Sequence, residues 1–172
     1  MVLTTMTELQ FNFGTKHNTP SWRIVNDGVM GGLSSSQLKE NENSVLFNGN
    51  TSLENNGGFA SMRTLFEKGS LSDCKTMTIR YKSNSINRTF GLSLKDSQRY
   101  YIPYYQHKFS PKTTDWEEIT VNLKDFKHIR ISQIIGNKMP LDYLKDVYNI
   151  ALIVSDKKAG NFDIEIDYIE FK

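Results

Sequence analysis

At 172 residues the chain is long enough for one domain with a buried core and short for two. Its 21 Lys and Arg and 19 Asp and Glu give a net charge of +2, without the stripe of clustered basic residues expected for nucleic-acid binding. An aromatic content of 12%, with recurring Val, Ile and Thr, favours strands over helices.

Targeting signals are absent from the sequence pattern. No stretch approaches the ~20 apolar residues that span a bilayer, so we expect no membrane span. The N-terminal MVLTTMTELQFNFG has neither the segments of a signal peptide nor the arginine-rich character of a transit peptide. A single cysteine, Cys74, cannot form an internal disulfide. We therefore expect a cytoplasmic protein in which Cys74 is a small buried apolar side chain.

Short runs that alternate apolar and polar residues recur from one end of the chain to the other. Each run predicts a half-buried strand, because successive side chains of a strand point to opposite faces. The second run is predicted to end in a turn at Asn48–Asn50, and the last places Phe162, Ile164, Ile166 and Tyr168 on one face. The runs cover residues 9–13, 44–53, 58–66, 75–83, 88–96, 116–123 and 161–171.

The segments near the C-terminus differ from this pattern. Residues 148–156 are continuously apolar in their centre, which predicts a central strand covered on both faces, with a short buried helix as the alternative. Residues 140–148 predict a short helix, and residues 124–132 a bend followed by an extended segment. About ten strands with one short helix imply an all-β sandwich or barrel, with residues 1–172 as a single domain.

The stretch WRIVNDGVMGGLSSSQL, residues 22–38, is the most unusual in the chain. Its glycines lack the spacing of a dinucleotide fingerprint, and no Lys is present for a Walker-type phosphate loop. The serines follow the glycines, so a nucleophile elbow is also excluded. What remains is a tight corner between two strands, with glycines at positive φ, or a binding loop.

A second glycine-rich stretch, NGNTSLENNGGFASMR, covers residues 48–63. Glu54–Gly58 carries strong turn signals, because Asn side chains can bond their own backbone and Gly accepts positive φ. The turn places polar groups beside Phe59 and Arg63.

These two stretches, with DWEEITVNLKDF and GNFDIEIDYI further on, resemble the signature of the complex I intermediate-associated protein 30 family. The resemblance runs from about Phe11 to Phe171 and implies a galactose-binding-domain-like jelly-roll sandwich. It also implies kinship with a mitochondrial chaperone that assists assembly of respiratory complex I. Because the chain begins almost at the domain, it is similar to bacterial members, whose function is unassigned.

The family has no established catalytic residues, so the resemblance implies no catalytic set. The positions that match its two N-terminal motifs are the candidate binding residues: Asn26, Asp27, Met30, Gly31, Gly32, Ser34, Asn55, Gly57, Gly58, Phe59 and Arg63.

The histidines and carboxylates give weaker indications of a metal or catalytic site. His17, His107 and His128 are far apart and have no metal-ligand spacing, so no metal or cofactor is predicted. Asp163, Glu165 and Asp167 share a strand face, for which a solvated surface is favoured over a calcium site. A glycosidase pair formed by Asp27 and Glu54 is disfavoured.

Aromatic residues gather in RYYIPYYQHKF, residues 99–109. Tyrosine rings can stack on sugars or partner surfaces, but we expect Tyr101 and Tyr105 to belong to the core. Trp22 and Trp116 are expected to be core or strand-end anchors.

Three functions follow from these observations. The first is a non-enzymatic module that binds another protein through its sandwich face and motif loops. The second is a carbohydrate-binding or small-ligand-binding module that uses Asp27, Asn55, Asn56 and the tyrosine-rich strand. The third is an enzyme, which requires Asp27, Arg63 and a histidine to meet in a polar pocket.

The role of Asp27 and Met30 can be stated more sharply. We expect Asp27 to accept backbone hydrogen bonds from its own loop or from the 54–59 turn, and Met30 to pack inward. Loss of the Asp27 carboxylate should then lower the free energy of unfolding by ~1–3 kcal/mol.

Overall fold

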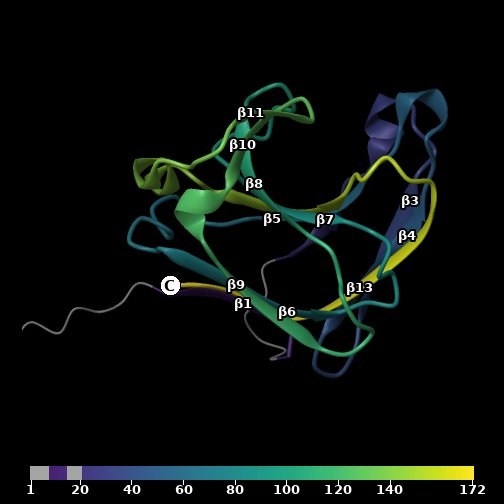
Figure 1. The fold of residues 1–172 in the computed structure, drawn as a ribbon, viewed down its shortest axis with the longest axis horizontal. Coiled ribbons are helices and arrows are strands. Elements are labelled where there is room, and N and C mark those ends of the chain that lie inside the picture. The colour runs from purple at the N-terminus through teal and green to yellow at the C-terminus, as the bar shows by residue number, and fades with distance from the viewer. Residues whose placement is uncertain (1–7, 15–20) are drawn as a thin grey trace, which may run out of the picture.

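Two antiparallel sheets packed face to face form the fold in the computed structural model, which describes residues 8–14 and 21–172 (Figure 1). The six-stranded sheet has the order β3-β4-β13-β6-β9, and β1 also pairs with β13. Its strands are β1 (Leu9–Asn12), β3 (Ser35–Glu40), β4 (Val45–Thr51), β6 (Thr76–Lys82), β9 (Glu117–Asn122) and β13 (Gly160–Phe171).

The seven-stranded sheet has the order β11-β10-β8-β7-β12-β5-β2. Its strands are β2 (Arg23–Ile24), β5 (Ala60–Leu65), β7 (Phe90–Lys95), β8 (Tyr104–Phe109), β10 (Lys127–Arg130), β11 (Gln133–Gly136) and β12 (Asn149–Val154). In the described part of the chain the helices are short 3-10 turns: η1 (Asp27–Met30), η2 (Glu54–Asn56), η3 (Leu123–Asp125) and η4 (Leu141–Lys145).

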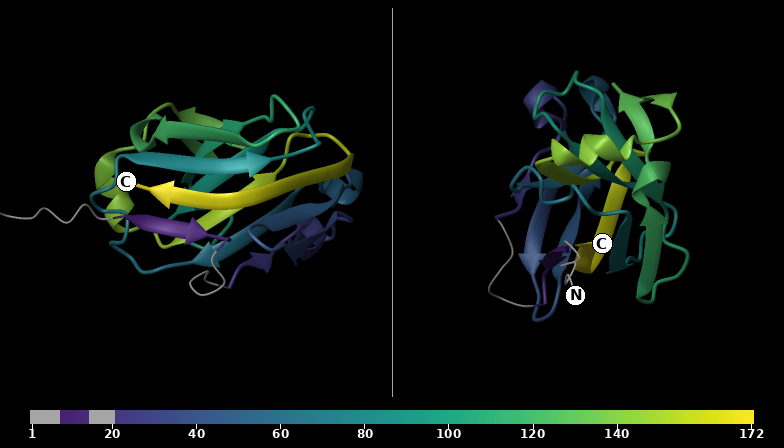
Figure 2. Two further views of the ribbon diagram at one scale, coloured as in Figure 1. Left: turned by 90° about the horizontal axis from the view of Figure 1, so that it is seen from below. Right: turned by 90° about the vertical axis from the view of Figure 1, so that its left-hand side faces the viewer.

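The period-two alternation puts one face of each sheet into the core. In β6 Met77, Ile79 and Tyr81 are buried, and the residues between them are half-buried on the outer face. In β5 Met62 faces the core and Arg63 the outside, so the two lie on opposite faces, as alternation in residues 58–66 predicts. The all-β sandwich is therefore confirmed, and both ends of the described chain lie in the six-stranded sheet, where β1 pairs with β13 (Figure 2).

Continuous apolar character correctly marks β12, which lies between β7 and β5. The predicted helix at residues 140–148 is the five-residue 3-10 turn η4. Residues 8–14 and 21–172 form thirteen strands in place of the ten or so predicted. The additional ones are β2, with two residues, and β3 and β11, which have few buried apolar side chains and therefore show little alternation.

The turn predicted at Asn48–Asn50 is wrong, because β4 continues through these residues and pairs with both β3 and β13. Glycine is needed at position 49 because β3 and β4 approach each other closely there, and not because the chain turns. A Cβ atom on Gly49 would lie 2.1 Å from the carbonyl oxygen of Ser35 in β3.

The predicted phase of the last strand fails at Tyr168. The pairing of β13 with β6 shifts between Ile166 and Tyr168, and the extra residue reverses the alternation that follows. Ile169 and Phe171 are buried as a result, whereas Tyr168 points outward and donates a hydrogen bond to Glu118.

The predictions for single residues are partly confirmed and partly wrong. Cys74 and Tyr105 are buried, and Trp22 packs against the core through the ring of Phe11. Tyr101 was expected in the core but is 45% exposed. No helix among residues 8–14 and 21–172 has the length and apolar character to cross a membrane.

Candidate functional site

Asp27 joins the two glycine-rich stretches at one corner of the sandwich. Its side chain is fully buried and accepts hydrogen bonds from the backbone N–H of Ser34 at 2.9 Å, Gly58 at 2.6 Å and Phe59 at 3.1 Å. The Ser34 hydroxyl donates a fourth. The prediction that Asp27 accepts backbone hydrogen bonds from its own loop or from the 54–59 turn is confirmed, and both segments contribute donors.

Glycines surround this carboxylate because larger residues would collide with it. A Cβ atom on Gly32 would lie 2.4 Å from Asp27 Cγ, and one on Gly57 would lie 2.6 Å from Asp27 Oδ2. Gly31 and Gly58 have φ values of 85° and 123°, which side-chain-bearing residues rarely adopt. The glycine spacing is thus explained by the packing of the two stretches around one carboxylate.

The polar side chains of the corner also bond within it. Asn26 Oδ1 accepts a hydrogen bond from Ser36 Oγ at 2.7 Å, and Asn55 Nδ2 donates to the Gly31 carbonyl at 3.2 Å. Burial raises the pKa of Asp27, but the hydrogen bonds from Ser34, Gly58 and Phe59 outweigh it and lower the pKa below its ordinary value. Asp27 is therefore a charged carboxylate occupied by protein donors.

Met30 does not pack inward, so that prediction is wrong. Its side chain is 58% exposed at the last position of η1, which the left-handed Gly31 ends. Three more apolar side chains of the corner are exposed, namely Val29, Leu33 and Leu53. We call these four residues the apolar corner.

Arg63 has no hydrogen bond or ion pair with the other candidate residues and lies on the outer face of β5. The pairing register places a row of residues directly across this sheet, and directly paired residues point to the same face. From β2 to β10 the row consists of Arg23, Arg63, Ala151, Ser93, Gln106 and Lys127.

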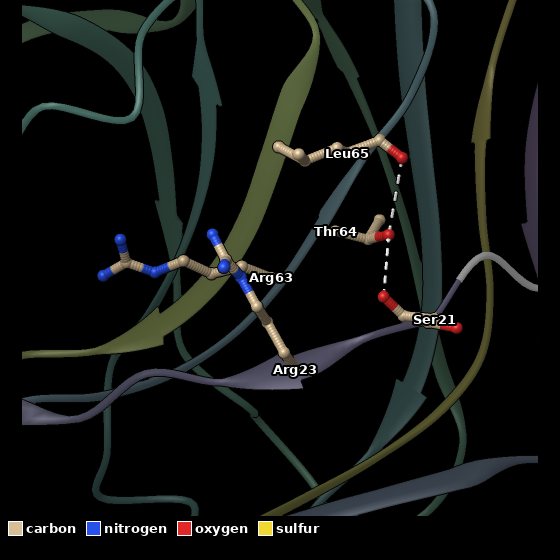
Figure 3. A pocket seen from close by; sticks show the side chains of 5 residues that line it. All are labelled: Ser21, Arg23, Arg63, Thr64 and Leu65. Atoms are coloured by element: carbon tan, nitrogen blue, oxygen red, sulfur yellow. Dashed lines mark hydrogen bonds between the residues drawn. The ribbon is translucent and has the colours of Figure 1, made fainter.

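An open pocket of about 230 Å³ begins at the Arg23 end of this row and is lined by Ser21, Arg23, Arg63, Thr64 and Leu65 (Figure 3). Arg23 and Arg63 are directly paired on neighbouring strands, and their side chains cross in the view of Figure 3. Arg63 Nε donates to Ser61 Oγ at 2.9 Å, and Arg23 Nη2 donates to Gln98 Oε1 at 2.8 Å. Both guanidinium groups keep further N–H donors free.

Lys95 of β7 is a third cation near Arg63. Its ammonium lies 4.3 Å from the ring centroid of Tyr104 and within electrostatic range of Arg63. Burial, and then repulsion from Arg63, lower the pKa of Lys95 to about 8. Burial also lowers the pKa of Arg63, and Arg23 adds to the effect. Among the described residues no carboxylate forms an ion pair with Arg23, Arg63 or Lys95, which we call the cationic cluster.

Asp27, Arg63 and the two described histidines do not come together as a catalytic constellation. Asp27 bonds neither Arg63 nor either of the two described histidines, and Glu54 is exposed without contact to Asp27. His128 stacks on Tyr105, His107 packs on Phe126, and His17 lies outside the described residues.

Metal-ligating side chains do not gather in the part of the chain that the structure describes. The described residues contain no group of three His, Cys, Asp or Glu side chains that could hold a metal. The carboxylates of β13 are instead engaged by protein donors: Asp163 by Ser85, Glu165 by Ser44 and Lys82, and Asp167 by Arg80.

Arg63 was among the residues predicted from the sequence, whereas its neighbours Arg23 and Lys95 were not. Each lies on a different strand, and only the register of β2, β5, β12 and β7 brings them to one face. The signal present in the sequence was a Lys or Arg at an outward position of an alternating run, which ordinary surface strands also show.

Solved structures of carbohydrate-binding modules and other β-sandwiches share this fold. A family 11 carbohydrate-binding module from Clostridium thermocellum, in complex with a β-1,3-1,4-mixed-linked tetrasaccharide, matches with a TM-score of 0.65 at 15% identity, covering 95% of this chain and 94% of that one. The agarase AgWH50C matches with a TM-score of 0.62 at 10% identity, covering 96% of this chain and 24% of that one.

A third similar structure is the K1 cleaved adhesin domain of Lys-gingipain from Porphyromonas gingivalis W83. It matches with a TM-score of 0.51 at 12% identity, covering 96% of this chain and 97% of that one. At these identities the likeness establishes the β-sandwich fold. The sequence itself matches the family described as Complex I intermediate-associated protein 30 (CIA30) over residues 11–166, and the chain belongs to that family.

Proposed function

We propose that this chain is a non-catalytic binding module that takes a carbohydrate on the outer face of its seven-stranded sheet. The observation that carries the proposal is the open pocket on this face, where Arg23 and Arg63 keep N–H donors free near the ring of Tyr104. Sugar hydroxyls suit convergent polar donors, and the apolar face of a sugar ring suits an aromatic ring.

Two further observations support a ligand on this face. Tyr100 and Tyr101, 72% and 45% exposed, lie in the loop that leads from Lys95 into β8 and offer additional rings. The Clostridium thermocellum module with the same fold was solved with a tetrasaccharide. Because a fold does not specify a ligand, the proposal depends on the side chains of this chain.

Oligosaccharide binding, screened on a glycan array and measured by calorimetry, tests this function. Tyr104→Ala should weaken binding of a glycan hit at least tenfold, since stacking and the shape of the face are lost. Trp116→Ala is the matched control, because Trp116 is a partly exposed aromatic residue at β9 of the other sheet. It should leave binding unchanged.

Two results would overturn the proposal. A screen without a hit in the millimolar range would remove carbohydrate binding as the function. A loss of binding in Trp116→Ala, with Tyr104→Ala unaffected, would move the binding face to the six-stranded sheet.

The second candidate function is protein binding at the apolar corner. Its specific observation is the exposure of Val29, Met30, Leu33 and Leu53, at 73%, 58%, 57% and 46%, on two loops that hydrogen-bond to each other. Exposed apolar side chains that cluster on rigid loops are typical of docking surfaces. The family name associates its members with an intermediate of complex I, so respiratory-complex subunits are the partner class to test.

Site-specific photo-crosslinking in native cells tests this second function. A crosslinking residue at position 33 should capture a respiratory-complex subunit. The same residue in place of Ile86, which is 52% exposed on a different loop, should capture none. Equal capture from both positions, or none from position 33, would reject the apolar corner as the docking surface.

A further inference from the structure

The outer face of the seven-stranded sheet carries charge of one sign. The strands β2, β5, β12, β7 and β8 are neighbours in this sheet. Each of their outward-pointing side chains that is charged at neutral pH is a cation, and these residues are Arg23, Arg63, Lys95 and Lys108. The six-stranded sheet lacks this asymmetry, because its outer Arg80 and Lys82 are paired with Asp167 and Glu165.

The middle of the cationic face is lined by short side chains. Ala151 and Ser93 lie in the row that begins with Arg23 and Arg63, and each is only 1% exposed although it faces away from the core. Longer neighbouring side chains must therefore cover them. Gln106 covers Ser93, to which it donates a hydrogen bond at 2.8 Å. Arg63 and Lys95, half-buried on either side of β12 and within electrostatic range of each other, are positioned to cover Ala151.

A buried amide in the next row also lacks a partner. Asn149 pairs in register with Lys95 and Leu65, so its side chain is on the outer face, and it is only 2% exposed. Its Oδ1 has no hydrogen-bond partner. Unpaired buried polar groups and like charges held together both cost stability, and such costs are typical of binding sites.

We propose that this face takes an acidic saccharide, with one carboxylate or sulfate of the sugar bound between Arg23, Arg63 and Lys95. The proposal rests on the carbohydrate-binding function and specifies its ligand class. Guanidinium groups present paired N–H donors that match the oxygens of either anion, and the ammonium of Lys95 supplies a third point of contact. That ammonium lies over the ring of Tyr104, so an aromatic side chain stands beside the anion site.

Calorimetry with matched acidic and neutral probes tests the ligand class. The probes are an oligogalacturonate and its methyl ester, and a sulfated galactan oligosaccharide with its desulfated form. The acidic member of at least one pair should bind tenfold or more tightly than its neutral partner, and the difference should shrink in high salt. Comparison of the two pairs distinguishes carboxylate from sulfate.

Two variants and a control locate the anion. Arg63→Gln and Lys95→Met should each reduce affinity for the acidic probe about tenfold more than affinity for its neutral partner, because only the acidic probe loses an ion pair. Arg80→Gln, a matched change on the other sheet at a guanidinium already paired with Asp167, should change neither. Circular dichroism and the melting temperature confirm that each variant is folded.

The outcomes separate the two proposals. If neutral probes bind as tightly as acidic ones, the acidic ligand class is wrong and the carbohydrate-binding function stands. If no probe binds, both proposals fail. If the acidic preference survives in both Arg63→Gln and Lys95→Met, the anion is not held by the cationic cluster.

Discussion

Asp27 shows how one residue can determine the sequence around it. Its carboxylate accepts from Ser34 in its own loop and from Gly58 and Phe59 across the corner, so the two loops have one common acceptor. Solvent does not reach this side chain, and a variant without the carboxylate would leave the donors unpaired.

Replacement of Asp27 by Ala should therefore lower the free energy of unfolding by about 1–3 kcal/mol, measured by urea denaturation. The matched control is Asp142→Ala, because Asp142 is 82% exposed in its ion pair with Lys145 and should cost less than about 0.5 kcal/mol. Equal stability of the two variants would show that Asp27 does not hold the loops together.

Lys95, in contrast to Asp27, should lower the free energy of unfolding. Because the pKa of Lys95 in the folded protein is about 8, below the ordinary value of 10.5, its protonated form destabilises the fold at neutral pH. Lys95→Met should raise the free energy of unfolding at pH 7 by about 1–3 kcal/mol.

The pH dependence checks the cause. As the pH rises through 8 the folded protein releases the Lys95 proton before the unfolded chain does, so the wild type gains stability. The advantage of Lys95→Met should shrink between pH 8 and 10.5. A constant difference across this range would attribute the effect to packing instead of charge.

Among the elements, the two motif loops form a unit whose glycines are not equivalent. Gly32 faces the Asp27 carboxylate, whereas a Cβ atom on Gly28 would meet nothing within 4 Å. Gly32→Ala should lower the melting temperature by several degrees, equivalent to about 1–3 kcal/mol. Gly28→Ala is the matched control in the same loop and should be close to neutral. A reversed order would contradict the packing described here.

The connection from β12 to β13 is held by Arg88, which lies between β6 and β7. Its guanidinium donates to both oxygens of Asp156, to Thr51 Oγ1 and to the carbonyls of Lys158, Gly160 and Asn161. The two side chains of the ion pair are only 3% and 5% exposed.

Arg88→Met should therefore cost about 3–5 kcal/mol in urea denaturation, because it leaves Asp156 buried and unpaired. Arg88→Lys keeps the charge but not the planar set of donors, and should recover only part of the loss. Full recovery by Lys would show that charge alone matters at this position.

At the scale of the whole molecule, buried carboxylates make the fold acid-sensitive. Burial raises the pKa of Asp27, Asp156 and Glu165, but hydrogen bonds, from Arg88 to Asp156 and from Ser44 to Glu165 for example, lower all three below the ordinary values of 3.8 and 4.5. Such groups stabilise the folded state above their unfolded-state pKa, and this contribution is lost as the pH falls through the folded-state values.

The contribution of these carboxylates to the free energy of unfolding should thus be nearly constant from pH 7 to about 5 and decline steeply below pH 4. Urea titrations at successive pH values measure the decline. Asp156→Asn should flatten the curve, and an unchanged stability down to pH 3 would contradict the assignment.

Sequence alternation was sufficient for most of the fold. Met77, Ile79 and Tyr81 in β6, and the apolar run of β12, were placed correctly because burial of one or both faces leaves a direct trace in residue order. The phase of Tyr168 was not predictable, since a bulge shifts the register without a distinctive residue. Met30 was misjudged because its exposure depends on where Gly31 directs the chain.

The sequence by itself therefore determined the β-sandwich, the family and the partnership of Asp27 with the glycine-rich turn, because local alternation and motif order carry that information. Tertiary structure alone decided that Arg23, Arg63 and Lys95 share one face without a carboxylate partner among residues 8–14 and 21–172. The physical reason is that strands distant in sequence pair through backbone hydrogen bonds, and their register decides which outward side chains meet.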